Sequence, residues 1–188
     1  AVAGGYTGDR IDKATLASWR TSAGSPDTDV IADLPTLRQR AADLERNAPV
    51  GAAIINTSAS HVVGTGLACN PQIDGAFLGL SEEQIKEWQA DAKRRFNAWA
   101  TTPDCDLARK LNLYGIQDLA LRSTLSRGDV FVLTPRVARA MGSTRLALQL
   151  VEADRVCNPN GQRDTDTLTA GIEHSPETGE ALRVHVAD

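Results

Sequence analysis

Cysteine is scarce in this sequence of 188 residues, which has three, widely spaced and without a CxxC pair. An odd number at such spacing predicts free thiols in a reducing compartment and no structural disulfide. Long hydrophobic runs are also missing, since none approaches the roughly 18 residues that a membrane span needs. The first residues lack the charged start and apolar middle of a signal peptide. With 41% hydrophobic and 23% charged residues, the sequence predicts a folded, soluble protein without a membrane anchor.

Motifs that carry catalytic or metal chemistry are missing as well. The sequence has no GxSxG elbow, no Walker loop and no HExxH, and its three histidines have no zinc-site spacing. The acid pairs Asp104 with Asp106 and Asp164 with Asp166 lack the glycine and distal glutamate of a calcium loop. We therefore expect no catalytic, cofactor-binding or metal-binding residue, no cofactor, and no enzymatic activity. The alternative is an enzyme whose site is assembled from distant groups such as His61, Asp104 and Asp106.

The stretch SHVVGTGLACN at 60–70 places Gly64 and Gly66 directly after an apolar run, as nucleotide-binding loops do. The residues before it, PVGAAIINTSASHVVG, have helical spacing, and residues 67–73 have the composition of a strand. A nucleotide-binding loop requires a strand before its glycines and a helix after them. We therefore predict that these glycines end a helix, and that the chain binds neither ATP nor a dinucleotide.

Helical periodicity is clearest in LSEEQIKEWQADAKRRFNAWATTP, residues 80–103. Ser81 and Gln84 are spaced as a capping box, and acids precede bases along the segment, as the helix dipole favours. The spacing predicts a helix from 82 to about 101 with a buried stripe that includes both of its tryptophans: Ile85, Trp88, Ala92, Phe96 and Trp99.

Three further helices are predicted from the same periodicity. The first follows Asp33 and ends near residue 47, with a stripe at Leu34, Leu37, Ala41 and Leu44. The second begins at Pro49, with one face formed by Ile54, Ile55, Ser58 and Val62. The third runs from about 114 to 127 and stops at Gly128, with one side formed by Ile116, Leu119, Ala120 and Ser123.

Strand patterns follow the helices. DVFVLTP and RLALQLVEA read as strands joined by the basic loop RVARAMGST, and LTAGIEHS, PETGE and ALRVHVA read as a final hairpin with an exposed last strand. Helices followed by strands predict an α+β fold, with N-terminal helices packed on a small, mostly antiparallel sheet formed by the C-terminal strands. We expect an N-terminal arm at 1–28 and a single domain at 29–188.

The formal net charge of −4 is unevenly distributed. From Glu152 to Asp188 there are eight acids against three arginines, whereas Arg122 to Arg145 holds five arginines and one acid. Such a basic segment is typical either of a solvated loop or of a phosphate contact. The second alternative is therefore a nucleic-acid-binding adaptor that uses Arg122 to Arg145.

The run LPTLRQRAADLERNAPVGAAIINTSASHVVGTGL, residues 34–67, resembles the opening helical pair of lambda-family bacteriophage portal proteins. Later pieces agree with that family in order, namely FNAWA, GIQDLALRSTLSRGDVFV, LQLVEADRV and AGIEHSPETGEALRVHV. The resemblance covers nearly the whole chain. It suggests candidate contacts to DNA or a partner at Arg38, Arg40, Arg46, Arg136, Arg139 and Arg145.

The resemblance implies a structural role in a phage particle. Portal proteins form a ring, typically a dodecamer, at one capsid vertex, where terminase docks, double-stranded DNA passes through the channel, and capsid, scaffold and head-tail adaptor proteins attach. It implies a homo-oligomer located in the virion and, during assembly, in the host cytoplasm, with no membrane contact. It further implies that this chain is part of the portal wing region, truncated at its C-terminal end.

Overall fold

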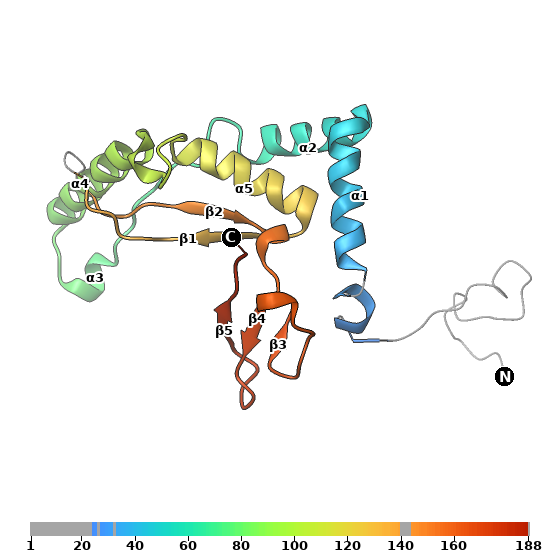
Figure 1. The fold of residues 1–188 in the computed structure, drawn as a ribbon. Helices are drawn as coiled ribbons and strands as arrows, with labels where there is room; N and C mark the ends of the chain where they lie inside the picture. The colour runs from blue at the N-terminus through green and yellow to red at the C-terminus, as the bar shows by residue number, and fades with distance from the viewer. Residues whose placement is uncertain (1–23, 26, 32, 140–143, 188) are drawn as a thin grey trace, which may run out of the picture. The chain divides into compact units, whose positions relative to one another are not determined.

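The computed structural model describes residues 24–25, 27–31, 33–139 and 144–187. The chain divides into two compact units, residues 1–34 and residues 35–188. In the first unit, the described residues include the short π-helical segment η2, Asp27–Ile31. All the other elements lie wholly or almost wholly in the second unit, and α1 begins at its boundary (Figure 1). The predicted division into an arm at 1–28 and a domain at 29–188 stays a prediction.

Two helices in tandem open the second unit. α1 spans Leu34–Asn47 and α2 spans Pro49–Val62, with proline at the start of α2, where a missing N–H group is tolerated. The two helices approach closely, because a Cβ at Gly51 would lie 2.6 Å from the carbonyl oxygen of Leu44. Gly64 and Gly66 follow α2 with φ of 55° and 113°, which confirms that these glycines end a helix. The strand predicted at 67–73 is wrong, because these residues are irregular and pair with no strand.

The periodicity located α1, α2 and α5 correctly, but several apolar side chains of the predicted stripes and faces are exposed in the structure. Leu37 and Leu44 of α1, Ile54 and Val62 of α2, and Leu119 of α5 are between 45% and 61% exposed. The buried positions of the first two helices are instead Ala42, Ile55 and Ala59. α2 packs against α5. Small side chains let helix backbones approach closely, so the packed face is not the most hydrophobic one.

α3 (Gly75–Leu78) leads to α4 (Glu82–Ala100), and the predicted capping box of Ser81 and Gln84 is present. Within the predicted stripe of α4, Trp88 is 44% exposed, so its predicted burial is wrong, whereas Trp99 is partly buried in the core cluster. A 3-10 turn, η3 (Pro103–Cys105), connects α4 to α5 (Leu113–Arg127). Gly128 ends α5 with φ of 88°, as predicted.

The strands confirm the α+β class and divide between two antiparallel sheets. β1 (Val130–Leu133) pairs with β2 (Gln149–Glu152) as a ribbon that packs against α5 (Figure 1). The short 3-10 turns η4 (Ala153–Arg155) and η5 (Pro159–Gly161) then lead to the second sheet. That sheet has the order β3-β4-β5, with bounds Leu168–Thr169, Ile172–His174 and Ala181–Val184.

The core is small and lies where α4, η3, α5 and β2 meet. Its buried members are Ala100, Cys105, Leu113 and Ile116, with partly buried side chains packed around them from Phe96, Trp99, Tyr114, Leu148 and Leu150. The largest side chains that are completely buried are only a valine and a cysteine, Val151 and Cys105. A core of this size leaves many large apolar side chains on the surface, which makes the surface the place to look for function.

Candidate interaction surfaces

The outward face of α2 is apolar, and two leucines of α1 are exposed as well. Val50 is 72% exposed, and Leu37, Leu44 and Ile54 are each more than half exposed. A shallow hollow of about 530 Å³ runs along α2 and is lined by Pro49, Val50, Ala53, Ile54, Thr57 and Ser58. α2 also contains no aspartate, glutamate, lysine or arginine. A contiguous apolar surface without charge is typical of a face that another protein surface covers.

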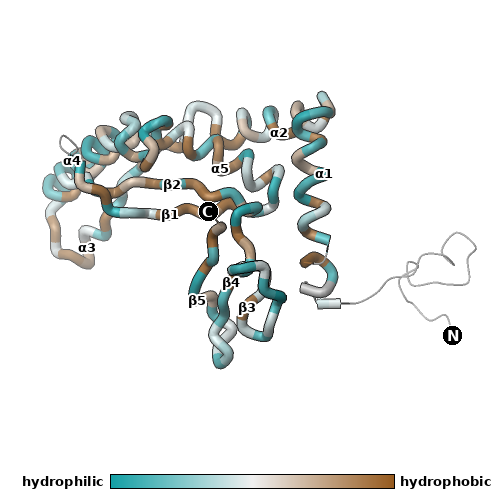
Figure 2. Tube along the Cα trace, viewed as in Figure 1, coloured by the Kyte–Doolittle hydropathy of each residue, from teal (hydrophilic) through white to brown (hydrophobic). Residues whose placement is uncertain are grey.

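A second group of exposed apolar side chains lies on α3 and α4. Phe77 is 86% exposed and Leu78 is 52% exposed, and Trp88 follows on α4. Much of α3 is hydrophobic in the tube of Figure 2. The two caps keep this helix short: Asp74 caps its N-terminus, and Gly79, with φ of 65°, ends it within one turn. The sequence analysis missed this surface, because a single turn of helix has no periodicity to detect.

The last strand, β5, is an open sheet edge. All four of its residues are exposed, including Leu182 at 56% and Val184 at 41%. β5 pairs with β4 on one side and, among the residues that the structure describes, forms no ladder on the other. The predicted exposure of this strand is confirmed. An unpaired edge with apolar side chains is a template for pairing with another chain.

The candidate arginines of α1 have different surroundings. The side chain of Arg38 is 16% exposed and donates hydrogen bonds to the backbone oxygens of Arg127 and Ala153. Arg46 donates within its own helix, to the oxygen of Ala42. Arg40 is exposed, and its side chain contacts no polar group in the described part of the chain. Of the three, Arg40 is the one whose guanidinium is both exposed and uncommitted.

The basic segment from Arg122 to Arg145, which begins within α5, is divided in the same way. Arg139 donates to the backbone oxygen of Asp106 at 2.8 Å, so its guanidinium stabilises the loop between α4 and α5. Arg122 and Arg127 bond carboxylates and an amide within the domain, at Asp118, Asp154 and Asn56. Arg136 and Arg145, by contrast, are exposed, and no side-chain partner of either lies in the described ranges.

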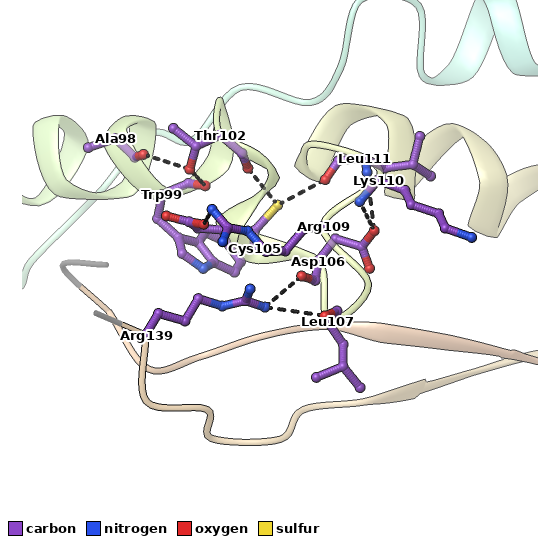
Figure 3. A network of polar contacts seen from close by, with 11 residues as sticks. Ala98, Trp99, Thr102, Cys105, Asp106, Leu107, Arg109, Lys110, Leu111 and Arg139 are labelled. Atoms are coloured by element: carbon purple, nitrogen blue, oxygen red, sulfur yellow. Dashed lines mark hydrogen bonds and ion pairs between the residues drawn. The ribbon is translucent and has the colours of Figure 1, made fainter. Parts of the chain in front are cut away.

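A polar network holds the loop between α4 and α5, as Figure 3 shows. The Asp106 carboxylate accepts hydrogen bonds from the backbone N–H groups of Ala108, Lys110 and Leu111, at 2.8 to 3.1 Å. The Cys105 thiol lies buried beneath it and donates to the backbone oxygen of Thr102. From the sequence, Asp106 was recognised only as one member of an acid pair that lacks the features of a calcium loop. Aspartate commonly stabilises a turn by accepting hydrogen bonds from backbone N–H groups of its own loop. The polar residues that follow Asp106 in the sequence could have suggested such a turn.

The pKa of Asp106 is lowered by this arrangement. Burial alone would raise the pKa, but the backbone N–H groups of Lys110, Leu111 and Ala108 together outweigh burial. For Cys105 the balance is opposite, because burial, followed by the nearby Asp106 carboxylate, raises the pKa of the thiol. Cys105 is therefore a buried thiol that resists ionisation, which makes it a packing residue and a poor nucleophile.

We expect Asp106→Asn to lower the free energy of unfolding by about 1 to 2 kcal/mol at neutral pH, because an amide replaces a charged acceptor. Since the folded pKa is depressed, the contribution of the carboxylate is present above the ordinary aspartate pKa. It is lost as pH falls through the lowered value. Urea denaturation as a function of pH should therefore show the variant and wild-type converging in acid.

Asp166→Asn is the matched control for this prediction, because Asp166 is exposed and its carboxylate has no partner among the described residues. It should leave both stability and its pH dependence nearly unchanged. A constant difference between Asp106→Asn and wild-type at every pH would contradict the role given to the ionised carboxylate.

The groups proposed for an assembled active site are engaged separately. Asp104 pairs with Arg109 at 2.9 Å, and Asp106 binds its own loop. His61 stands at the end of α2, and no hydrogen bond or ion pair in the described ranges joins it to either aspartate. Among the described residues, no group of three histidine, cysteine or acidic side chains could hold a metal ion, and no helix is long and apolar enough to cross a membrane. The three cysteines are free.

Comparison with known proteins gives a consistent result. The family model for phage portal protein, lambda family, matches residues 12–188. Portal protein B of Escherichia phage lambda is 23% identical over 175 residues, which cover 92% of this chain and 33% of the relative. The portal protein of Escherichia phage N15 is 25% identical over 175 residues, with the same shares. This chain thus spans 33% of the length of these curated relatives.

Proposed function

Because the chain belongs to the lambda family of phage portal proteins, we propose that it is a structural subunit of a portal ring at a capsid vertex. The observation that carries this proposal is the family match over residues 12–188. In that role the ring provides the channel for packaging and ejecting DNA and connects head to tail. The subunit breaks no bond itself, in keeping with the separate engagement of Asp104 with Arg109 and of Asp106 with its own loop.

The proposal includes the partners and the place of action. The subunit assembles with further copies of itself, typically twelve in the family. It also contacts terminase, capsid or scaffold proteins and head-tail adaptors, and double-stranded DNA passes through the ring. It acts in the virion and, during assembly, in the host cytoplasm. Residues 29–188 form one α+β domain of the wing region, preceded by an arm at 1–28.

The exposed apolar side chains of the domain support the proposal that it is part of a larger assembly. Three separate regions expose large apolar side chains, with Val50 on α2, Phe77 on α3 and Leu182 on β5 as their most exposed members. Isolated exposed leucines are ordinary on any protein, but faces of this kind are usually covered by a neighbouring surface. A ring supplies such neighbours, because each subunit in it has two.

Electron microscopy of the protein expressed from its complete reading frame tests the proposal. Rings with a central channel are the expected result. Particles that stay monomeric at every concentration, in buffers where the protein is folded by circular dichroism, would contradict the portal role.

The isolated 188-residue chain should bind duplex DNA only weakly. Arg122, Arg127 and Arg139 are engaged within the domain, which leaves Arg136 and Arg145 as the free arginines of the basic segment. The excess of acids after Glu152 opposes a polyanion as well. We expect dissociation constants in the non-specific range, about 10⁻⁴ to 10⁻⁶ M at physiological salt.

Titration of a labelled duplex at several salt concentrations measures this affinity. The few free arginines of this segment should give a shallow dependence on salt, and Arg136→Ala with Arg145→Ala should change the affinity little. Nanomolar binding that falls steeply with salt and is lost in this double variant would instead support the nucleic-acid adaptor.

A further inference from the structure

The β1–β2 ribbon has opposite charges at its two ends. At one end Leu133 pairs with Gln149, and the loop segments 134–139 and 144–148 adjoin the two strands there. At the other end Val130 pairs with Glu152, and the chain continues into the β3–β5 sheet. Between Val130 and Val151 there are three arginines and no acid, whereas between Asn158 and Ala187 there are five acids and two arginines.

The basic end presents two arginines side by side. The loop continues the pairing of the ribbon, since Arg136 bridges Leu146 and the N–H of Val137 donates to the oxygen of Arg145 at 2.7 Å. These contacts hold Arg136 and Arg145 on opposing segments of one hairpin, both exposed. Exposed apolar side chains flank them, namely Val132, Leu133 and Leu146, at 41% to 47%.

The acidic end presents three carboxylates at one end of β4. Thr167 accepts a hydrogen bond from the N–H of His174, and Ser175 donates to the oxygen of Glu180, so the turns on both sides of β4 meet there. Asp166, Glu177 and Glu180 lie in these turns, are exposed, and have no side-chain partner in the described part of the chain. The open edge β5, with Leu182 and Val184 exposed, borders the same sheet.

The two ends cannot neutralise each other within one chain. Val130 and Arg136 are six residues apart along β1 and the bridged segment that follows it, which is roughly 20 Å at about 3.3 Å per extended residue. Charges at that distance are screened, since the Debye length at physiological ionic strength is about 8 Å. Each end therefore keeps its charge and its exposed apolar side chains for a contact outside the chain.

We propose that the acidic β3–β5 sheet of one copy docks on the paired basic segments 134–139 and 144–148 of a second copy. Charge complementarity favours a second copy of this chain as the partner, because one surface carries unpaired arginines and the other carries unpaired carboxylates. Both surfaces also carry exposed apolar side chains. The contact joins two different surfaces, so it repeats head to tail, and copies related by rotation close into a ring. Ring closure rests on the proposed portal function, but the docking contact itself does not.

Charge reversal on each surface tests the docking. The acidic surface is reversed by Glu177→Lys with Glu180→Lys, and the basic surface by Arg136→Glu with Arg145→Glu. The control is Glu83→Lys with Glu87→Lys, which makes the same change of charge as the acidic-surface variant, on exposed positions of α4. Sedimentation equilibrium of the 188-residue chain over a wide concentration range measures self-association, and circular dichroism checks that each variant is folded.

Each reversed variant should associate at least about tenfold more weakly than wild-type, because like charges then face each other. Association should return when both reversals are combined in one chain, and when the two reversed variants are mixed in equal amounts, because each contact again joins opposite charges. The control should associate as wild-type does. If the reversed variants had only lost their fold or their solubility, combining or mixing them would not restore association.

Two results would overturn the docking contact. One is a wild-type chain that remains monomeric at every concentration. The other is reversed variants that associate as strongly as wild-type, or that fail to recover when combined. Electron microscopy of the same variants in the complete reading frame separates the two proposals. Rings that form regardless of these charges would remove the docking contact and leave the portal function standing.

Discussion

Replacing Trp99 by alanine is expected to lower the free energy of unfolding by about 2 to 4 kcal/mol, because a large ring leaves the core cluster. Trp99 packs against the buried group formed by α4, η3 and α5, and its ring lies 5.8 Å from that of Phe96 at 59°. Its indole N–H also donates to the backbone oxygen of Leu146 at 2.9 Å. The substitution therefore removes both apolar contact and a link from α4 to the segment before β2. Urea denaturation followed by circular dichroism measures the loss.

Trp88→Ala is the matched control on the same helix. Trp88 is 44% exposed and is no member of the core cluster, so its removal should change the free energy of unfolding by less than about 1 kcal/mol. Equal losses for the two tryptophans would mean that the helix buries the face predicted from the sequence. A loss confined to Trp88→Ala would contradict the core described for this domain.

The difference between these tryptophans shows what helical periodicity can predict. The capping residues Ser81 and Gln84 fixed where α4 begins, because capping is a local interaction between residues three apart. Which part of a five-turn stripe is covered depends on distant segments, here η3, α5 and β2. Those contacts form only toward the C-terminal end of α4, so Trp99 is packed and Trp88 is not.

The surfaces could be predicted only in part for a similar reason. The exposed final strand followed from its position after the last turn, and Leu182 is indeed on an open edge. The face of α2 formed by Ile54, Ile55, Ser58 and Val62 was predicted as one face of a helix, but the sequence did not indicate that Ile54 and Val62 are exposed while Ile55 is buried. Hydrophobic residues at an interface and in a core have the same composition, so the sequence pattern alone cannot distinguish them.

The arginines illustrate a further limit, since their charge is visible in the sequence but their partners are not. Arg38 and Arg40 stand two residues apart on α1 and were equivalent candidates for contact with DNA or a partner. In the structure Arg38 is largely covered and Arg40 is exposed. A guanidinium that bonds backbone oxygens of the same domain supports the fold, whatever its charge suggests.

Arg38→Ala is accordingly expected to destabilise the domain by about 2 to 3 kcal/mol, because hydrogen bonds from a charged group to partly buried acceptors are lost. Nε of Arg38 donates to the oxygen of Arg127 at 2.9 Å, in the last turn of α5, and Nη2 lies 3.3 Å from Asp129. A lysine cannot reach these acceptors together, so Arg38→Lys should recover little of the loss. Hydrogen exchange should accelerate in α1 and remain slow in α4, since Arg38 makes polar side-chain contacts from α1 to distant residues of the domain.

Arg40→Ala is the control, since Arg40 lies two residues along the same helix. Its free energy of unfolding should stay within about 0.5 kcal/mol of that of wild-type. If Arg38→Ala left stability unchanged but weakened binding to DNA, Arg38 would have to be assigned to a nucleic-acid contact after all.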